Sequence, residues 1–314
     1  MHGKNIRYVF ALALAAALAA CGGKQETAAP DLSQTGTPDG AIAAAVQSLK
    51  AGDMKSLVES QVPPSHMEKL RTEWKADMAK DPPSDEEKKE FADQMAELTA
   101  SDAEDKIMAK LEPELVKFET EMAPQMPLMI GMGKGLAANG LQENKELTQE
   151  QKDQAVKSID ALAKWVQETN FTDRAKVKAA VSKVVASARE LNLKTLDEAR
   201  ALSFDDAMVK GSIALRGFKQ VLDVYGFSLD KMLDSVKTEV VSQTDAAAKV
   251  KVSYQLFEQP MSFETELVKV DGRWYGKQTI DKLNNPEPAA IEEAPAMDEG
   301  ATEEPAATEE SAEG

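Results

Sequence analysis

The sequence has very few of the side chains that usually bind metals or act as nucleophiles. It contains one cysteine, Cys21, and two histidines, of which only His66 follows that cysteine. Protein zinc sites are built mainly from Cys and His, and a Cys/His nucleophile needs both groups side by side. We therefore expect no metal, no cofactor and no catalytic residues, in a protein that is not an enzyme. A lone cysteine also forms no internal disulfide.

Basic residues are also scarce relative to acidic ones. The chain has 37 Lys and Arg against 54 Asp and Glu, a formal net charge of −17. Proteins that bind nucleic acid neutralise its phosphates with clustered Lys and Arg, so we expect no nucleic-acid partner. Residues 285–314 contain many of the acids, lack Lys and Arg, and are rich in Pro, Ala, Glu and Thr. This composition predicts a disordered acidic tail.

Long hydrophobic runs are absent from the N-terminal region. The apolar run there covers residues 8–20, which is 13 residues, whereas a membrane-spanning helix needs about 20. Lys4 and Arg7 precede this run, and small residues end it. A cationic start, a short apolar run and small residues at the end are the three parts of a secretory signal.

The residues Leu18, Ala19, Ala20 and Cys21 resemble the lipobox of bacterial lipoprotein signal peptides. The resemblance implies that residues 1–20 are removed, that the Cys21 thiol is acylated, and that the mature chain is anchored to a membrane. Several acyl chains hold a protein stably. Cys21 is followed by Gly22 and not by Asp, which favours the outer membrane, with the periplasmic face expected. Residues 21–36 have little to bury and are predicted to form a flexible tether.

Residues 37–284 are predicted to form a folded body that is mainly helical. Thr37 and Pro38 suit the start of a helix, and Gly52 suits its end. Apolar residues then recur at helical spacing from about residue 65 to residue 235. Five capping boxes predict helix starts in this region. They are Ser65/Glu68, Ser84/Glu87, Ser101/Glu104, Thr148/Gln151 and Thr195/Glu198.

The pattern changes to strands in residues 237–280. Val250, Val252, Tyr254 and Leu256 alternate with polar residues, which predicts a half-buried strand. Asp271-Gly272 lies between two further apolar segments and is a strong hairpin signal. We therefore expect a small antiparallel sheet after the helices, in an α+β fold that is predominantly α-helical.

Two parts of the body together resemble small bacterial lipoproteins of the NTF2-like or cystatin-like type. They are the pair of helices expected in residues 37–62 and the strands of residues 237–280, which end in Asp-Gly-Arg-Trp-Tyr. The resemblance implies helices packed on one face of a curved antiparallel sheet. It leaves out the long helical region between them, which would be a large insertion, and it assigns no catalytic residue.

An apolar, methionine-rich stretch between residues 122 and 141 is the one candidate functional surface. Its only charged residue inside these limits is Lys134. One interpretation is a buried connection between helices, because Met often fills irregular cores. The other is an adaptable apolar surface that binds a ligand, a partner or the membrane. The candidate residues are Met126, Leu128, Met129, Ile130 and Met132.

The sequence predicts a lipid-anchored protein of the bacterial cell envelope that works by binding. Its membrane contact would be the lipidated Cys21, and its partner another envelope protein or an apolar ligand. Two alternatives stay open. A carrier of lipid in the periplasm would enclose a cavity lined by residues 122–141, and a hydrolase would need a cluster of carboxylates in a pocket.

Overall fold

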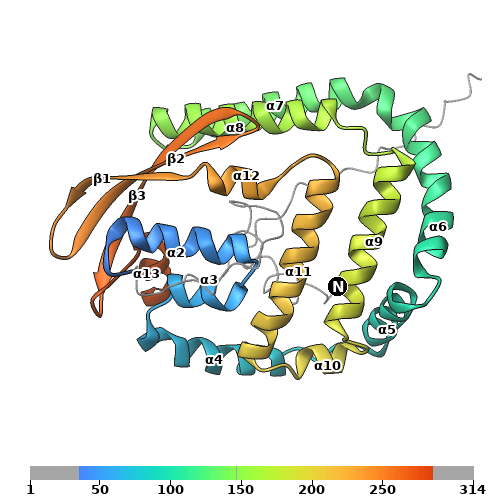
Figure 1. Cartoon of the computed structure of the whole chain (residues 1–314), viewed down its shortest axis with the longest axis horizontal. Helices are drawn as coiled ribbons and strands as arrows, with labels where there is room; N and C mark the ends of the chain where they lie inside the picture. The colour runs from blue at the N-terminus through green and yellow to red at the C-terminus, as the bar shows by residue number, and fades with distance from the viewer. Residues whose placement is uncertain (1–34, 146, 286–314) are drawn as a thin grey trace, which may run out of the picture.

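The computed structural model describes residues 35–145 and 147–285, and most of them are helical (Figure 1). The helices are α2 (Pro38–Ala51), α3 (Met54–Gln61), α4 (Pro64–Ala79), α5 (Asp85–Thr99), α6 (Ala103–Lys117), η2 (Phe118–Met122), η3 (Ala123–Gln125), α7 (Met126–Glu143), α8 (Gln149–Glu168), α9 (Arg174–Leu191), α10 (Leu196–Arg200), α11 (Phe204–Val224), α12 (Leu229–Asp234) and α13 (Lys277–Asn284). The strands are β1 (Lys237–Gln243), β2 (Ala247–Leu256), β3 (Gln259–Val270) and β4 (Arg273–Gly276).

The predicted helix starts are confirmed at three of the five capping boxes. Ser84, Thr148 and Thr195 each accept a backbone hydrogen bond from the Glu or Gln three residues later, whose side chain bonds back. The prediction is wrong at Ser65, because Pro63 and Pro64 start α4 earlier and place Ser65 inside its first turn. It is also wrong at Ser101, because α6 begins after Asp102.

The four strands form a single antiparallel sheet in the order β1-β2-β3-β4. The hairpin predicted at Asp271-Gly272 is confirmed: both residues have positive φ, 51° and 82°, as a type I′ turn requires. Strand β2 turns Val250, Val252 and Leu256 into the core. The alternation read from the sequence therefore gives the correct register of buried and exposed residues.

Helix α2 packs on the sheet, which is also contacted by α3, α8, α12 and α13. Ala41 of α2 packs with Val250, Leu267 and Trp274 in one buried cluster. A second cluster joins α2, α3, α8, α11 and α12 to strands β2 and β3, with Leu215 among its buried members. Farther from the sheet, α9 packs beside α11 on one side and against α5 and α6 on the other (Figure 1).

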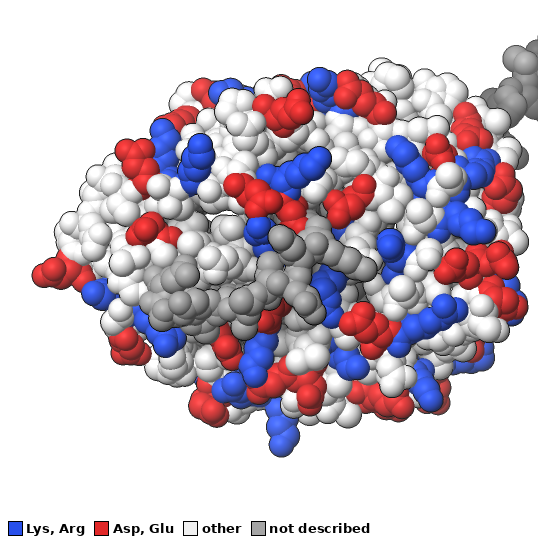
Figure 2. Space-filling model, viewed as in Figure 1, with Lys and Arg blue, Asp and Glu red and all other residues white. Residues whose placement is uncertain are grey.

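The fold class predicted from the sequence is confirmed: the chain is α+β and predominantly α-helical, with a small antiparallel sheet. The short C-terminal helix α13 was not predicted. Acidic and basic side chains are interspersed over the face in Figure 2, without a large area of one sign among the described residues.

Candidate binding surface on helix α7

The apolar stretch singled out in the sequence lies at the end of a long, bent run of helix. Helix α6 passes directly into a π-helical turn, η2, a 3-10 turn, η3, and then α7, and the bend carries the chain from α6 across to α8 (Figure 1). The bend has local causes. Pro113 lies inside α6, Pro124 lies in η3, and Pro127 lies in the first turn of α7; prolines and π-helical turns are the usual causes of kinks.

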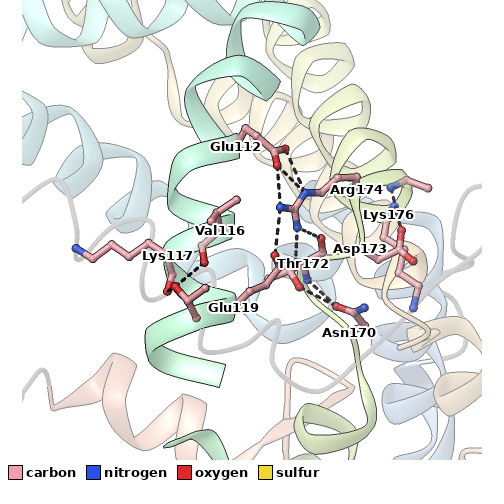
Figure 3. Close-up of polar contacts among 11 residues, drawn as sticks. Glu112, Val116, Lys117, Glu119, Asn170, Thr172, Asp173, Arg174 and Lys176 are labelled. Carbon is pink, nitrogen blue, oxygen red and sulfur yellow. Dashed lines mark hydrogen bonds and ion pairs between the residues drawn. The ribbon is translucent and has the colours of Figure 1, made fainter. Parts of the chain in front are cut away.

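Arg174 holds this bend to the start of α9 (Figure 3). Its Nε lies 3.1 Å from both carboxylate oxygens of Glu112, and its Nη1 donates to Glu119 and, at 2.8 Å, to the carbonyl of Thr172. These contacts raise the pKa of the Arg174 guanidinium, with Glu112 contributing most, and Arg174 lowers the pKa of Glu119. One guanidinium thus joins α6, η2 and the loop before α9.

Helix α7 rests on α8, and α8 rests on the sheet. Lys134 of α7 lies 2.6 Å from Asp160 of α8, and Lys152 of α8 donates to the carbonyl of Gln142 in the last turn of α7 at 2.7 Å. Helix α8 reaches β3 through the side chain of Gln154. The only charge of the apolar stretch is therefore neutralised on the α8 side, which leaves the outer side of α7 uncharged between Met126 and Gln142.

The outer side of α7 carries a row of large apolar side chains. Leu128, Met132 and Leu136, spaced four residues apart, are 68%, 62% and 72% exposed, and Met129 beside them is 47% exposed. We call these four residues the apolar ridge. Met126 and Ile130 are partly buried. The interpretation of this stretch as a buried connection is therefore wrong: no residue of α7 is buried.

The structure divides the five residues predicted for this surface and adds another. Leu128, Met129 and Met132 belong to the ridge, whereas Met126 and Ile130 lie nearer α8. Leu136 was not predicted. It lies four residues after Met132 and eight after Leu128, so in a helix it shares their face, and a helical reading of the stretch would have included it. The prolines and glycines concealed that helix.

The glycines of α7 have no evident role within the chain. Gly131, Gly133, Gly135 and Gly140 have ordinary helical backbone, and a Cβ atom added at any of them would meet no atom within 4 Å. Glycine inside a helix costs about 1 kcal/mol relative to alanine. Four such residues therefore destabilise α7 by roughly 4 kcal/mol, and neither their backbone angles nor their neighbours require them.

The structure does not bring three other groups together in a reactive site: the glycines of residues 131–135, His66 and Glu264. Gly131–Gly135 lie within α7 and so form no phosphate-binding loop. His66 contacts Ser65 and Asn284, and Glu264 pairs with Lys249 at 3.1 Å. Within residues 35–145 and 147–285, no three His, Cys, Asp or Glu side chains converge as metal ligands would. None of these contacts builds a catalytic group.

A pocket of about 510 Å³ lies between α4 and the start of α11, beside Trp74, Met78 and Phe204. Two polar contacts of its lining lie within the protein: Trp74 Nε1 donates to the carbonyl of Leu202 at 3.0 Å, and the Arg71 Nε lies 3.1 Å from Asp205. None of its lining residues comes from residues 122–141. The cavity expected of a carrier is therefore not built from the predicted residues here, and the carrier alternative stays a prediction.

The predicted lipidation site lies outside the described residues, as do Leu18, Ala19 and Ala20, nearly all of the tether and nearly all of the acidic tail. Within the part of the chain that is described, no helix combines the length and the hydropathy that crossing a bilayer requires.

Comparison with known proteins adds no relative. No family model, no curated protein and no solved structure matches the chain. The resemblance of the body to NTF2-like and cystatin-like lipoproteins therefore stays a prediction, and the functional argument depends on the residues of this chain alone.

Proposed function

We propose that this chain is a non-enzymatic binding protein of the bacterial cell envelope, anchored to the outer membrane by acyl groups on Cys21 and facing the periplasm. It binds a protein partner through the apolar ridge of α7. The observation that carries the proposal is the exposure of Leu128, Met129, Met132 and Leu136 on one helix.

The ridge stands out because of what surrounds it. The chain is acidic and its surface is densely charged, yet the exposed side of α7 bears no charge between Met126 and Gln142. Large apolar side chains gathered on a surface usually mark an interaction site. Burying each of these Leu or Met side chains stabilises a complex by about 1.5–3 kcal/mol. The ridge can therefore supply most of the affinity of a modest protein contact.

The anchor is supported by the sequence of the N-terminal region. Cys21 is the only cysteine, and it directly follows a short apolar run and two alanines. An exposed thiol in an oxidising compartment would be reactive, whereas an acylated thiol is not. The anchor also keeps the ridge close to other envelope proteins, which raises its effective concentration.

The binding proposal is tested by photo-crosslinking in living cells. A benzophenone amino acid replaces Met132 in the full-length chain, and a matched control carries it at Val209, which is 54% exposed on α11. We expect a protein adduct from position 132 and none from position 209. Absence of a protein adduct at position 132, or equal adducts at both positions, would contradict binding through the ridge.

A further inference from the structure

The exposed side of α7 has a groove beside its ridge. Gly131 and Gly135 follow Leu128 and Met132 by three positions each, and both glycines are exposed. Rows of side chains four residues apart form the ridges and grooves through which helices pack. Here a row of Leu and Met lies next to a row with two successive positions that lack a side chain. A helix approaching this face can therefore bring its backbone close to that of α7.

The glycines of this groove point to such an approach. Apart from α7's own backbone, none of the described residues lies within 4 Å of a Cβ built at Gly131 or Gly135, so this part of one copy gives no reason for a residue that weakens a helix. Small residues four apart in an apolar helix allow close helix–helix contact. The exposed ridge and the unexplained glycines are independent observations, and one partner helix accounts for both.

We propose that this partner is a second copy of the chain, paired with the first through α7 across a two-fold axis near Met132 and Gly135. The proposal rests on the proposed function, since it names the partner of the same surface. A two-fold contact places a surface against itself, so it requires a ridge and a matching groove on one face. In such a pair Met132 of each copy enters the groove between Gly131 and Gly135 of the other, with the helices crossing at about −50°.

The charges permit two copies to pair through this face of α7. Removal of residues 1–20, which contain Lys4 and Arg7 and no acid, takes the net charge of the chain from −17 to −19. Two such chains repel each other, and like charges placed face to face are costly. The outer side of α7 avoids this cost because it carries no charge along the ridge, and Lys134 is already paired with Asp160 on the α8 side. Self-association through this face therefore does not place like charges opposite each other.

Membrane attachment through Cys21 compensates for the small area of the contact between two α7 helices. One helix face is smaller than the roughly 800 Å² per partner of a standard interface, so the pair needs a high local concentration. Attachment of both copies to one membrane supplies it. The 14 residues from Cys21 to Gln34 can span at most about 50 Å, about the diameter of a body of this size, so a tether of this length leaves a body room to turn α7 toward a second copy.

The test uses the full-length chain with Met132→Cys in isolated membranes. Cys21 is the only native cysteine, so with its thiol acylated the new cysteine is the one free thiol, and a short bis-maleimide joins two chains only where two α7 helices meet. We expect a product of twice the chain mass that contains only this chain. We expect Gly131→Gln with Gly135→Gln to reduce its yield at least tenfold, because the long side chains fill the groove.

The matched control is Gly133→Gln with Gly140→Gln, which adds the same side chains to α7 outside the groove. It should retain the product, and the protease resistance of the body should be unchanged in both variants. No product, a product only with another protein, or equal loss in both variants would overturn pairing through α7. A product from the parent chain without Met132→Cys would contradict acylation of Cys21, and with it the membrane attachment on which the pairing depends.

Discussion

At the scale of single residues, the least expected feature is a buried ion pair that joins α2, α11 and α12. Lys219 is buried and donates to the carbonyls of Leu49 and Lys50 at 3.2 and 2.7 Å, at the end of α2. Asp230 Oδ1 lies 3.8 Å from its Nζ and has no hydrogen-bond partner. Burial raises the pKa of Asp230 to about 6, with Asp223 and Asp234 adding to the rise and Lys219 and Lys50 opposing it.

This raised pKa makes a prediction about stability and pH. Because the pKa of Asp230 is higher in the folded chain than in the unfolded chain, ionisation of Asp230 weakens the fold as the pH rises from about 4 to about 6. Asp230→Asn removes that loss. We expect the unfolding free energy of this variant minus that of the parent to be about 2 kcal/mol larger at pH 8 than at pH 4, measured by denaturant unfolding at both pH values. A difference that does not change with pH would contradict the prediction.

At the scale of elements, helix starts could be predicted only where the residues around them gave a single clear signal. Where Ser or Thr directly precedes a helix and no proline starts that helix earlier, as at Ser84, the predicted helix start is correct. At Ser65 the two prolines move the start, because Pro64 is itself suited to the first helical position. Residues 122–141 were interpreted as a buried connection or an adaptable surface and not as a helix, yet they contain most of α7. The prolines lie in η3 and the first turn, where no helical hydrogen bond is lost.

The bend before α7 depends on Arg174, which gives a second prediction. Arg174→Gln removes the contacts to Glu112 and Glu119, so residues 118–125 should exchange their amide hydrogens several-fold faster, with α2 and β2 unchanged. A control, Lys89→Gln, removes an exposed ion pair within α5 and should leave residues 118–125 as they are. Equal exchange of these residues in the Arg174 variant and the parent would show that the prolines alone fix the bend.

At the scale of the whole molecule, the fold class was predictable and the arrangement was not. The change from helical to alternating pattern near residue 237 identified the sheet, and Asp271-Gly272 identified one of its turns. The turn at Phe257-Glu258 was not predictable, because both residues have positive φ and neither is glycine. Its support is tertiary: the Phe257 ring lies 5.8 Å from that of Trp165 and 4.6 Å from that of Phe227. The exposure of α7 likewise depends on packing that no local pattern encodes.

Under our proposal, acylated Cys21 holds the protein at a membrane, and the apolar ridge of α7 binds its partner. The most direct test of this account is the intact mass of the full-length chain purified from bacterial membranes, beside that of Cys21→Ser. We predict a chain that begins at Cys21 and is heavier by its acyl groups, and a variant that is neither cleaved nor acylated. A parent chain that keeps residues 1–20, or carries no added mass on Cys21, would contradict the account.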